Sequence, residues 1–394
     1  MLPGESSIGI RKKLVVKGKI LVAMEGFIQT VQAKCSAALK YALASEFLLA
    51  LVVAVVMIGG SIALGYENNK IVPLNPAASA HYTQEPHNPL RYMANWDAPI
   101  YMNIAEHGYS DKTLTNFFPL YPLTVSYMHI FIDSVLYSGL LVAWGFFVGA
   151  IYFYLKIIKQ MYRLTSNNEA LRGVLFFVLF PTSIFLMAPY TESLYACTAF
   201  AAVYFTLKKN YIPAALFAVA VTATHANGFF VLILMGLLML EQKEKLTKIA
   251  AALAVGSIGT LSYMAYLQAK FHNALEFAAA QKNHSWVNVG PWHLLTVVAA
   301  RNGIFLLLLI VAALYWWNRR RSFSVYVLLY AGIVFISARG MSGLGRYSLI
   351  AFPVQIMLYD YLSNKKVGYS IVLAICSVVW AYFTMQYLGG YSGG

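Results

Sequence analysis

Charged side chains are scarce in this chain. Asp, Glu, Lys and Arg make up 11% of its 394 residues, whereas 60% of the residues are hydrophobic. Soluble domains carry about 25% charged residues. A soluble fold of this length has room for a large core, but it cannot hide so many unbroken apolar runs. The composition therefore predicts an all-α, polytopic membrane protein.

Cysteine is scarce as well. The three cysteines, Cys35, Cys197 and Cys376, are odd in number and lie mostly within apolar runs, so they supply neither a disulfide framework nor a zinc-binding spacing. The sequence also has no repeat of about 20 to 50 residues. No small-residue cleavage site follows the first apolar run, so we expect that run to be retained rather than removed as a signal peptide.

Long apolar runs are abundant. Eleven of them approach the about 17 to 25 residues that a transmembrane helix needs, and several are short or interrupted. They are 47–65, 136–157, 171–188, 193–208, 211–225, 227–240, 248–267, 302–317, 322–338, 347–363 and 367–388. We therefore expect a basic cytoplasmic segment over 1–46, a transmembrane domain over 47–388 and a flexible tail over 389–394.

Lys and Arg are distributed unevenly over the segments between these runs. If the N-terminus is cytoplasmic, the inner segments hold 21 of the 29 Lys and Arg residues and the outer segments hold 8. Such an excess orients membrane proteins with the positive segments inside. The net charge of +14 is then explained by topology and by contact with anionic lipids, and we expect no nucleic-acid partner. Residues 11–46 fit a basic amphipathic helix on the inner surface or, alternatively, a solvated tail.

The same charge rule decides the status of residues 117–133. This stretch is apolar enough to span a membrane, but counting it as a span would invert the charge bias of every later loop. We therefore predict a juxtamembrane or partly re-entrant helix containing Pro119 and Pro122. The first outer loop then covers about 66–135, and the second long outer segment covers about 268–301.

The most informative stretch lies in the first outer loop. Residues 95–109 read NWDAPIYMNIAEHGY, and FFPLYP follows at 117–122. Asp97 is a lone acid beside Trp96, among aromatic residues of the membrane interface, which indicates chemistry at the bilayer surface. The alternative is an aromatic belt without catalysis.

Further polar residues collect at the predicted outer ends of the spans. They are Glu192 in APYTESL, His225 and Asn227 in ATHANG, Gln281, Lys282, His284 and Trp286 in the second outer segment, and Arg339 and Arg346 in RGMSGLGRY. Ionisable residues near hydrocarbon are costly and tend to face a functional cavity. Each has a plainer alternative: Glu192 would cap the helix starting near Ser193, His225 would be a hydrogen-bonded core histidine, and Arg346 would anchor its span at the headgroup level.

These motifs carry a resemblance. WDAPIYMNIAEHGY, FFPLYPL, APYTESLY, THANG, NALEFAAAQKNHSW and GRYSLIAFP, together covering about 90–355, resemble the PIG-V-like mannosyltransferases, the family of GPI mannosyltransferase II and its prokaryotic relatives within the GT-C class. Family members usually have Arg where this chain has His225. The resemblance implies a GT-C-like fold with about 11 transmembrane helices and juxtamembrane helices in the first outer loop.

The activity that the resemblance implies is sugar transfer at the outer or luminal face of a membrane. The donor would be a polyprenyl-phosphate sugar, with mannose as the sugar, and the acceptor would be a glycolipid, a glycan or a protein. The protein would be a multi-pass protein of a bacterial or archaeal cytoplasmic membrane, or of the endoplasmic reticulum. Two alternatives from other classes are a secondary transporter, which predicts inverted repeats and charges near the bilayer midplane, and a non-catalytic scaffold subunit.

The chemistry of such a transfer assigns roles to several residues. An inverting transfer needs a base beside the acceptor hydroxyl, and Asp97 is our candidate. Arg346 is the first candidate for binding the donor phosphate, because a guanidinium grips phosphate oxygens bidentately; Lys282 and Arg301 are secondary candidates. Glu192 is the second acid. The candidates for lining the substrate are Trp96, Tyr101, His107, Tyr121, Tyr190, His225, Asn227, Gln281 and Trp286.

We expect no cofactor and no obligatory metal. Asp97 and Glu192 are able in principle to share a divalent ion through oxygen ligands. The outer segments, however, contain no compact acidic cluster such as DxD.

Overall fold

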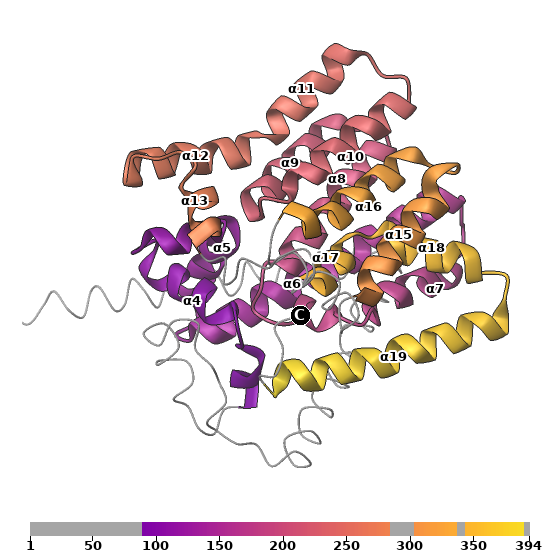
Figure 1. The fold of residues 1–394 in the computed structure, drawn as a ribbon, viewed down its shortest axis with the longest axis horizontal. Helices are drawn as coiled ribbons and strands as arrows, with labels where there is room; N and C mark the ends of the chain where they lie inside the picture. The colour runs from indigo at the N-terminus through magenta and orange to yellow at the C-terminus, as the bar shows by residue number, and fades with distance from the viewer. Residues whose placement is uncertain (1–88, 284–302, 337–342, 390–394) are drawn as a thin grey trace, which may run out of the picture.

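The structure, a computed structural model, describes residues 89–283, 303–336 and 343–389 (Figure 1). The predicted basic segment 1–46, the predicted span 47–65 and the tail after Gly389 lie outside the described residues. Two candidate site residues, Trp286 and Arg301, also lie outside them.

Every regular element within the three described ranges is a helix, which confirms the predicted all-α class. The α-helices are α4 (Ala98–His107), α5 (Leu120–His129), α6 (Val135–Tyr162), α7 (Asn167–Val178), α8 (Glu192–Leu207), α9 (Tyr211–Thr224), α10 (Gly228–Glu241), α11 (Leu246–Gly256), α12 (Ile258–Phe271), α13 (Glu276–Asn283), α15 (Gly303–Trp317), α16 (Arg321–Ile336), α17 (Leu344–Ile350), α18 (Pro353–Leu362) and α19 (Lys366–Leu388). Short 3₁₀ helices are η1 (Pro89–Met93), η2 (Lys112–Asn116) and η3 (Ser183–Leu186).

Several of these helices have the length and apolarity of membrane spans. Among the described residues, α6 and α19 are each long and apolar enough to cross a bilayer, and α11 with α12 form a third candidate bent by 42°. Shorter apolar helices are α9, α10, α15 and most of α16. At about 1.5 Å per residue, α6 exceeds the about 30 Å hydrocarbon thickness. The protein is thus a helical membrane protein, while the count of eleven spans and the orientation stay predictions.

Two of the predicted spans are broken helices. The run 171–188 contains α7, a turn and η3, and the run 347–363 is divided between α17 and α18. Pro353 begins α18, and because a proline has no N–H it cannot continue the hydrogen bonds of the helix before it. The breaks have a consequence for function, because the irregular segment 179–191 and the short helix α17 carry side chains that meet.

Residues 117–133 form the ten-residue helix α5 with flanking turns. A helix of this length is about 15 Å long, half of the hydrocarbon thickness. One face of α5 leaves Leu123, Tyr127 and Ile130 exposed. Both observations support the predicted juxtamembrane helix.

The two predicted outer segments pack against each other. Figure 1 shows α13 close to α4 and α5, at the end of the molecule where α12 finishes. Phe118 and Phe277 meet edge to face with ring centroids 5.4 Å apart, and the Tyr263 hydroxyl donates to the carbonyl of Thr115 at 2.8 Å. Along another side of the molecule runs α19, whose contacts with η1 bring the last helix to the first outer loop.

Candidate active site

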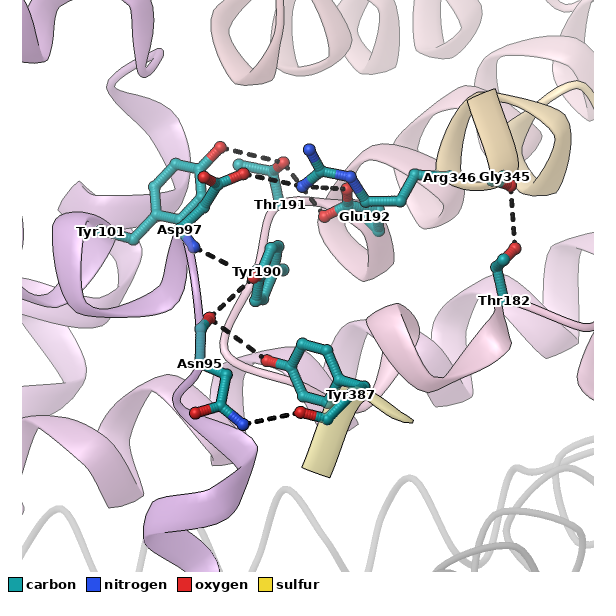
Figure 2. A network of polar contacts seen from close by, with 10 residues as sticks. All are labelled: Asn95, Asp97, Tyr101, Thr182, Tyr190, Thr191, Glu192, Gly345, Arg346 and Tyr387. Atoms are coloured by element: carbon teal, nitrogen blue, oxygen red, sulfur yellow. Dashed lines mark hydrogen bonds and ion pairs between the residues drawn. The ribbon is translucent and has the colours of Figure 1, made fainter. Parts of the chain in front are cut away.

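Asp97, Arg346 and Glu192 form one ion cluster (Figure 2). Nη1 of Arg346 lies 2.8 Å from Oδ2 of Asp97 and 3.6 Å from Oε1 of Glu192. The exposed fractions of the three side chains are 20% for Arg346, 22% for Asp97 and 11% for Glu192. Because water is largely excluded, these charges interact more strongly than a surface pair does. The structure thereby joins three residues predicted separately from sequence.

Asp97 is held at the start of α4. It is the N-cap residue, and its carbonyl accepts from the N–H groups of Ile100 and Tyr101. The preceding residue, Trp96, has a φ of 58°, in the left-handed region that bulky residues rarely occupy. This turn directs the Asp97 side chain toward the ion cluster.

Arg346 is brought in by α17. The neighbouring Gly345 allows a close approach, since a Cβ atom there would lie 2.8 Å from Cγ2 of Thr182. The Thr182 hydroxyl also donates to the carbonyl of Gly345 at 2.8 Å. The guanidinium carbon of Arg346 lies 5.4 Å from the ring centre of Phe185 and 5.7 Å from that of Tyr190, within cation–π range. The segment 179–191 before α8 therefore supplies the side chains on which the arginine packs.

Glu192 lies in the first turn of α8, whose N-cap is Thr191. The position agrees with the predicted helix-capping role, because an acid stabilises a helix N-terminus, and it also places Glu192 in the cluster. The Thr191 hydroxyl lies 3.4 Å from Glu192 Oε2 and 3.4 Å from the Tyr101 hydroxyl. Burial, and after it the nearby carboxylates, raises the pKa of Tyr101 far above its ordinary value. Tyr101 therefore stays a neutral hydrogen-bonding group beside the acids.

The predicted lining residues differ in how close they come to the cluster. Trp96, Tyr101 and Tyr190 adjoin it, but the Tyr190 hydroxyl is occupied by main-chain groups. Tyr121 is fully buried, packs edge to face on Tyr101 and donates to the carbonyl of Gly139. His107 ends α4, about 15 Å along the helix from Asp97, and its side chain is 65% exposed. The structure thus makes Tyr121 a packing residue and leaves His107 apart from the cluster.

Tyr195 connects His225 and Asn227 to the cluster. It lies on α8, one helical turn after Glu192. The Tyr195 hydroxyl donates to the carbonyl of Asn227 at 2.9 Å, and its ring meets the His225 ring edge to face at 6.2 Å. Nδ1 of His225 accepts from the N–H of Asn227.

Three buried donors around this region have no partner among the described residues. They are Nε of Arg346, Nε1 of Trp96 and Nδ2 of Asn227. An unsatisfied buried donor costs about 1–3 kcal/mol, and such groups in a native structure call for an explanation. Hydroxyl and phosphate oxygens are acceptors of the kind that such donors bind.

The remaining candidates are not brought to the cluster. Gln281 is exposed on α13. Lys282 belongs to the same helix, but its side chain lies outside what the structure describes. Their predicted roles stay predictions, as do those of Trp286 and Arg301.

The expectation that no metal is obligatory stays a prediction. Across the described ranges no group of three or more His, Cys, Asp or Glu side chains is arranged to hold a metal ion. The guanidinium of Arg346 contacts both carboxylates that we considered as shared ligands.

Two residues of the site were missed by sequence reasoning. Asn95 lies within the motif stretch, but its side chain carried no distinguishing signal. Tyr387 lies in the last apolar run, where a tyrosine is unremarkable in sequence. Only the fold shows that α19 reaches the first outer loop.

The fold and the ion cluster define a helical membrane protein with a polar site built between the segment that holds α4 and the break around α17. A family model described as Mannosyltransferase (PIG-V) matches residues 35–316, and the chain belongs to this family. The match ends before Arg346 and α19.

One curated relative adds to this assignment. The chain is 26% identical over 147 residues to GPI mannosyltransferase 2 of Schizosaccharomyces pombe, a match that covers 36% of this chain and 31% of that protein. The chain thus aligns with about a third of the relative's length.

Proposed function

We propose that the protein is a membrane mannosyltransferase that moves a mannosyl unit from a polyprenyl-phosphate donor to a glycolipid acceptor at the outer or luminal membrane face. Membership of the PIG-V family supports the sugar and the reaction class. The name of the relative, GPI mannosyltransferase 2, makes a glycosylphosphatidylinositol-type glycolipid the first acceptor to test.

The proposed reaction is a single inverting displacement. An acceptor hydroxyl oxygen attacks the anomeric carbon, the bond from that carbon to the phosphate oxygen breaks, and the phosphate departs as an anion on its lipid. The hydroxyl proton passes to Asp97. Because the ion pair uses Oδ2 of Asp97, we assign the proton to Oδ1. Arg346, whose Nε is buried without a partner among the described residues, stabilises the departing phosphate.

The observation that carries the proposal is the ion cluster itself. It joins the one acid of the WDA motif to an arginine 249 residues further along the chain. An inverting displacement needs a base on one side of the anomeric carbon and a group that stabilises the leaving phosphate on the other, and this one cluster holds a candidate for each role, Asp97 and Arg346. Glu192 adds a second anion that fixes the guanidinium between two carboxylates.

The test is sugar transfer by purified, monodisperse Asp97→Asn protein with a synthetic polyprenyl-phosphate mannose donor. The amide keeps the size of the side chain but cannot accept the proton, so turnover should fall by at least about 10²-fold.

Asp111→Asn is the matched control for this variant. Asp111 is an exposed acid of the same loop that caps η2 through Thr113, and asparagine caps a helix as well as aspartate does. It should keep its activity. Transfer by Asp97→Asn at the rate of the Asp111→Asn control would remove Asp97 as the base.

A further inference from the structure

The turn that carries Asp97 is strained. We call residues 95–97 the Trp96 turn, since Trp96 at its centre has a φ of 58°. A bulky non-glycine residue in this region is strained and persists only where its surroundings fix it. The strain lies directly before the proposed base, so whatever fixes the turn also fixes the direction of the carboxylate.

Tyr190 bridges the strained turn. Its hydroxyl donates to the carbonyl of Asn95 at 2.7 Å and accepts from the N–H of Asp97 at 3.0 Å, so one oxygen holds both sides of Trp96 (Figure 2). The side chain is fully buried, and its ring packs edge to face on Phe185 at 5.3 Å. Its hydroxyl is therefore committed to the main chain and not to a substrate.

A second tyrosine holds the turn from the other side. The Tyr387 hydroxyl donates to the carbonyl of Met93 at 2.7 Å and lies 3.5 Å from that of Asn95. In return, Nδ2 of Asn95 donates to the carbonyls of Tyr387 at 2.7 Å and Tyr92 at 2.9 Å. Carbonyls in the last turn of a helix lack regular helical partners, so Asn95 supplies a hydrogen bond to the end of α19.

We propose that Tyr190 is a positioning residue that sets the direction of the Asp97 carboxylate, with Tyr387 of α19 bracing the same turn. The inference rests on the proposed role of Asp97 as the base. It reassigns Tyr190 from lining the substrate, and it makes the last helix, which lies beyond the family match, part of the catalytic apparatus.

The decisive variant is Tyr190→Phe. It keeps the ring that lies 5.7 Å from the Arg346 guanidinium and removes only the hydroxyl that holds the turn. Turnover should fall by about 10- to 100-fold, because small misplacements of a reacting group have costs of this size. The Michaelis constant for the donor should stay near wild type, since Arg346 keeps its support.

The matched control is Tyr369→Phe. Tyr369 lies on α19, is buried, and donates its hydroxyl to a main-chain carbonyl, that of Arg172, far from the turn along the helix. Loss of its one hydrogen bond should lower the melting temperature slightly and leave turnover unchanged.

A double-mutant comparison separates positioning from general damage. If Tyr190 acts through Asp97, then Tyr190→Phe should cause no further loss in the Asp97→Asn background. An equal fractional loss in both backgrounds overturns the proposal, and so does a raised donor Michaelis constant with unchanged turnover.

Fluorine NMR gives a readout that does not depend on activity. The chain has seven tryptophans, and the Trp96 signal of fluorotryptophan-labelled protein is assigned with Trp96→Phe. Tyr190→Phe should shift or broaden this signal, and Tyr369→Phe should not. An unchanged Trp96 signal in Tyr190→Phe overturns the positioning role. Wild-type turnover by Asp97→Asn overturns the proposed base instead, whatever the Trp96 signal does.

Discussion

The two ends of α10 carry polar side chains in different surroundings. At the first end, Asn227 adjoins Tyr195 and the ion cluster, and its amide donor is buried without a partner among the described residues. At the other end, about 20 Å away, Glu241 pairs with Nε of Arg320 at 3.3 Å and accepts from the N–H of Ser322 at 3.0 Å. The Glu241 side chain is 34% exposed.

This difference separates a site from a solvated turn. Exposed ion pairs contribute about 0–1 kcal/mol, so the pair at Glu241 needs no function to explain it. The buried donors near Asn227 carry an unmet hydrogen-bonding capacity, which a protein retains where a ligand completes it. A partnerless buried atom alone does not mark the site, because Ser322 Oγ beside Glu241 is one as well; at the cluster such donors lie beside three ionisable side chains that are themselves largely buried.

The prediction with the largest expected effect concerns topology, that is, the side of the membrane on which each loop lies. If 117–133 does not cross the membrane, the loop before α7 is on the inner side. In protein without its native cysteines, a Cys at Asn167 should then react with an impermeant maleimide only from the inside.

A Cys at the exposed Ser110 of the first outer loop is the paired control, and it should react only from the outside. Labelling of residue 167 from the outside would invert the orientation after the first loop. It would also remove the charge argument for α5 as a juxtamembrane helix.

The prediction with the next largest effect compares Arg346 with Arg320. Arg346→Ala should raise the apparent Michaelis constant for the donor and lower turnover, together by about 10²- to 10³-fold in turnover over Michaelis constant, the usual cost of losing a group that stabilises developing negative charge. Arg346→Lys should recover only part of this loss, since lysine offers a point charge without the planar fork.

Arg320→Ala is the control for Arg346→Ala, because Arg320 pairs with Glu241 at the end of α10 away from the cluster. Steady-state kinetics should match wild type, and the free energy of unfolding should change by less than about 1 kcal/mol. Equal kinetic effects of the two alanine variants would show that burial of the cluster has no catalytic meaning.

Sequence patterns located the residues of the cluster but not their contacts. Asp97, Glu192 and Arg346 each stand out as ionisable groups at predicted span ends, which is a local signal. Their meeting depends on the breaks within 179–188 and before Pro353, which lie inside the predicted spans 171–188 and 347–363. A sliding-window average of hydropathy does not detect such breaks and predicts a continuous span.

The supporting tyrosines show a second limit. Tyr190, in the APYTESLY motif, was predicted to line the substrate, but whether a hydroxyl faces a cavity or a carbonyl depends on tertiary packing. The contact between Asn95 and Tyr387 joins residues 292 positions apart and has no signature in either segment. Helix class and charged groups were therefore predictable, whereas the hydrogen bonds that aim them were not.

The smallest effect compares two asparagines. Asn227 and Asn210 are both N-cap residues, of α10 and α9, and neither makes a side-chain capping bond. Asn210 is exposed, whereas Nδ2 of Asn227 is buried. Replacing either by alanine should therefore alter thermal stability little and to a similar extent.

If a substrate oxygen accepts from Nδ2, Asn227→Ala should also raise the Michaelis constant for donor or acceptor several-fold, equivalent to about 1 kcal/mol. Asn210→Ala should not. Matching Michaelis constants in the two variants would exclude the Asn227 amide from substrate binding and restrict the site to the ion cluster.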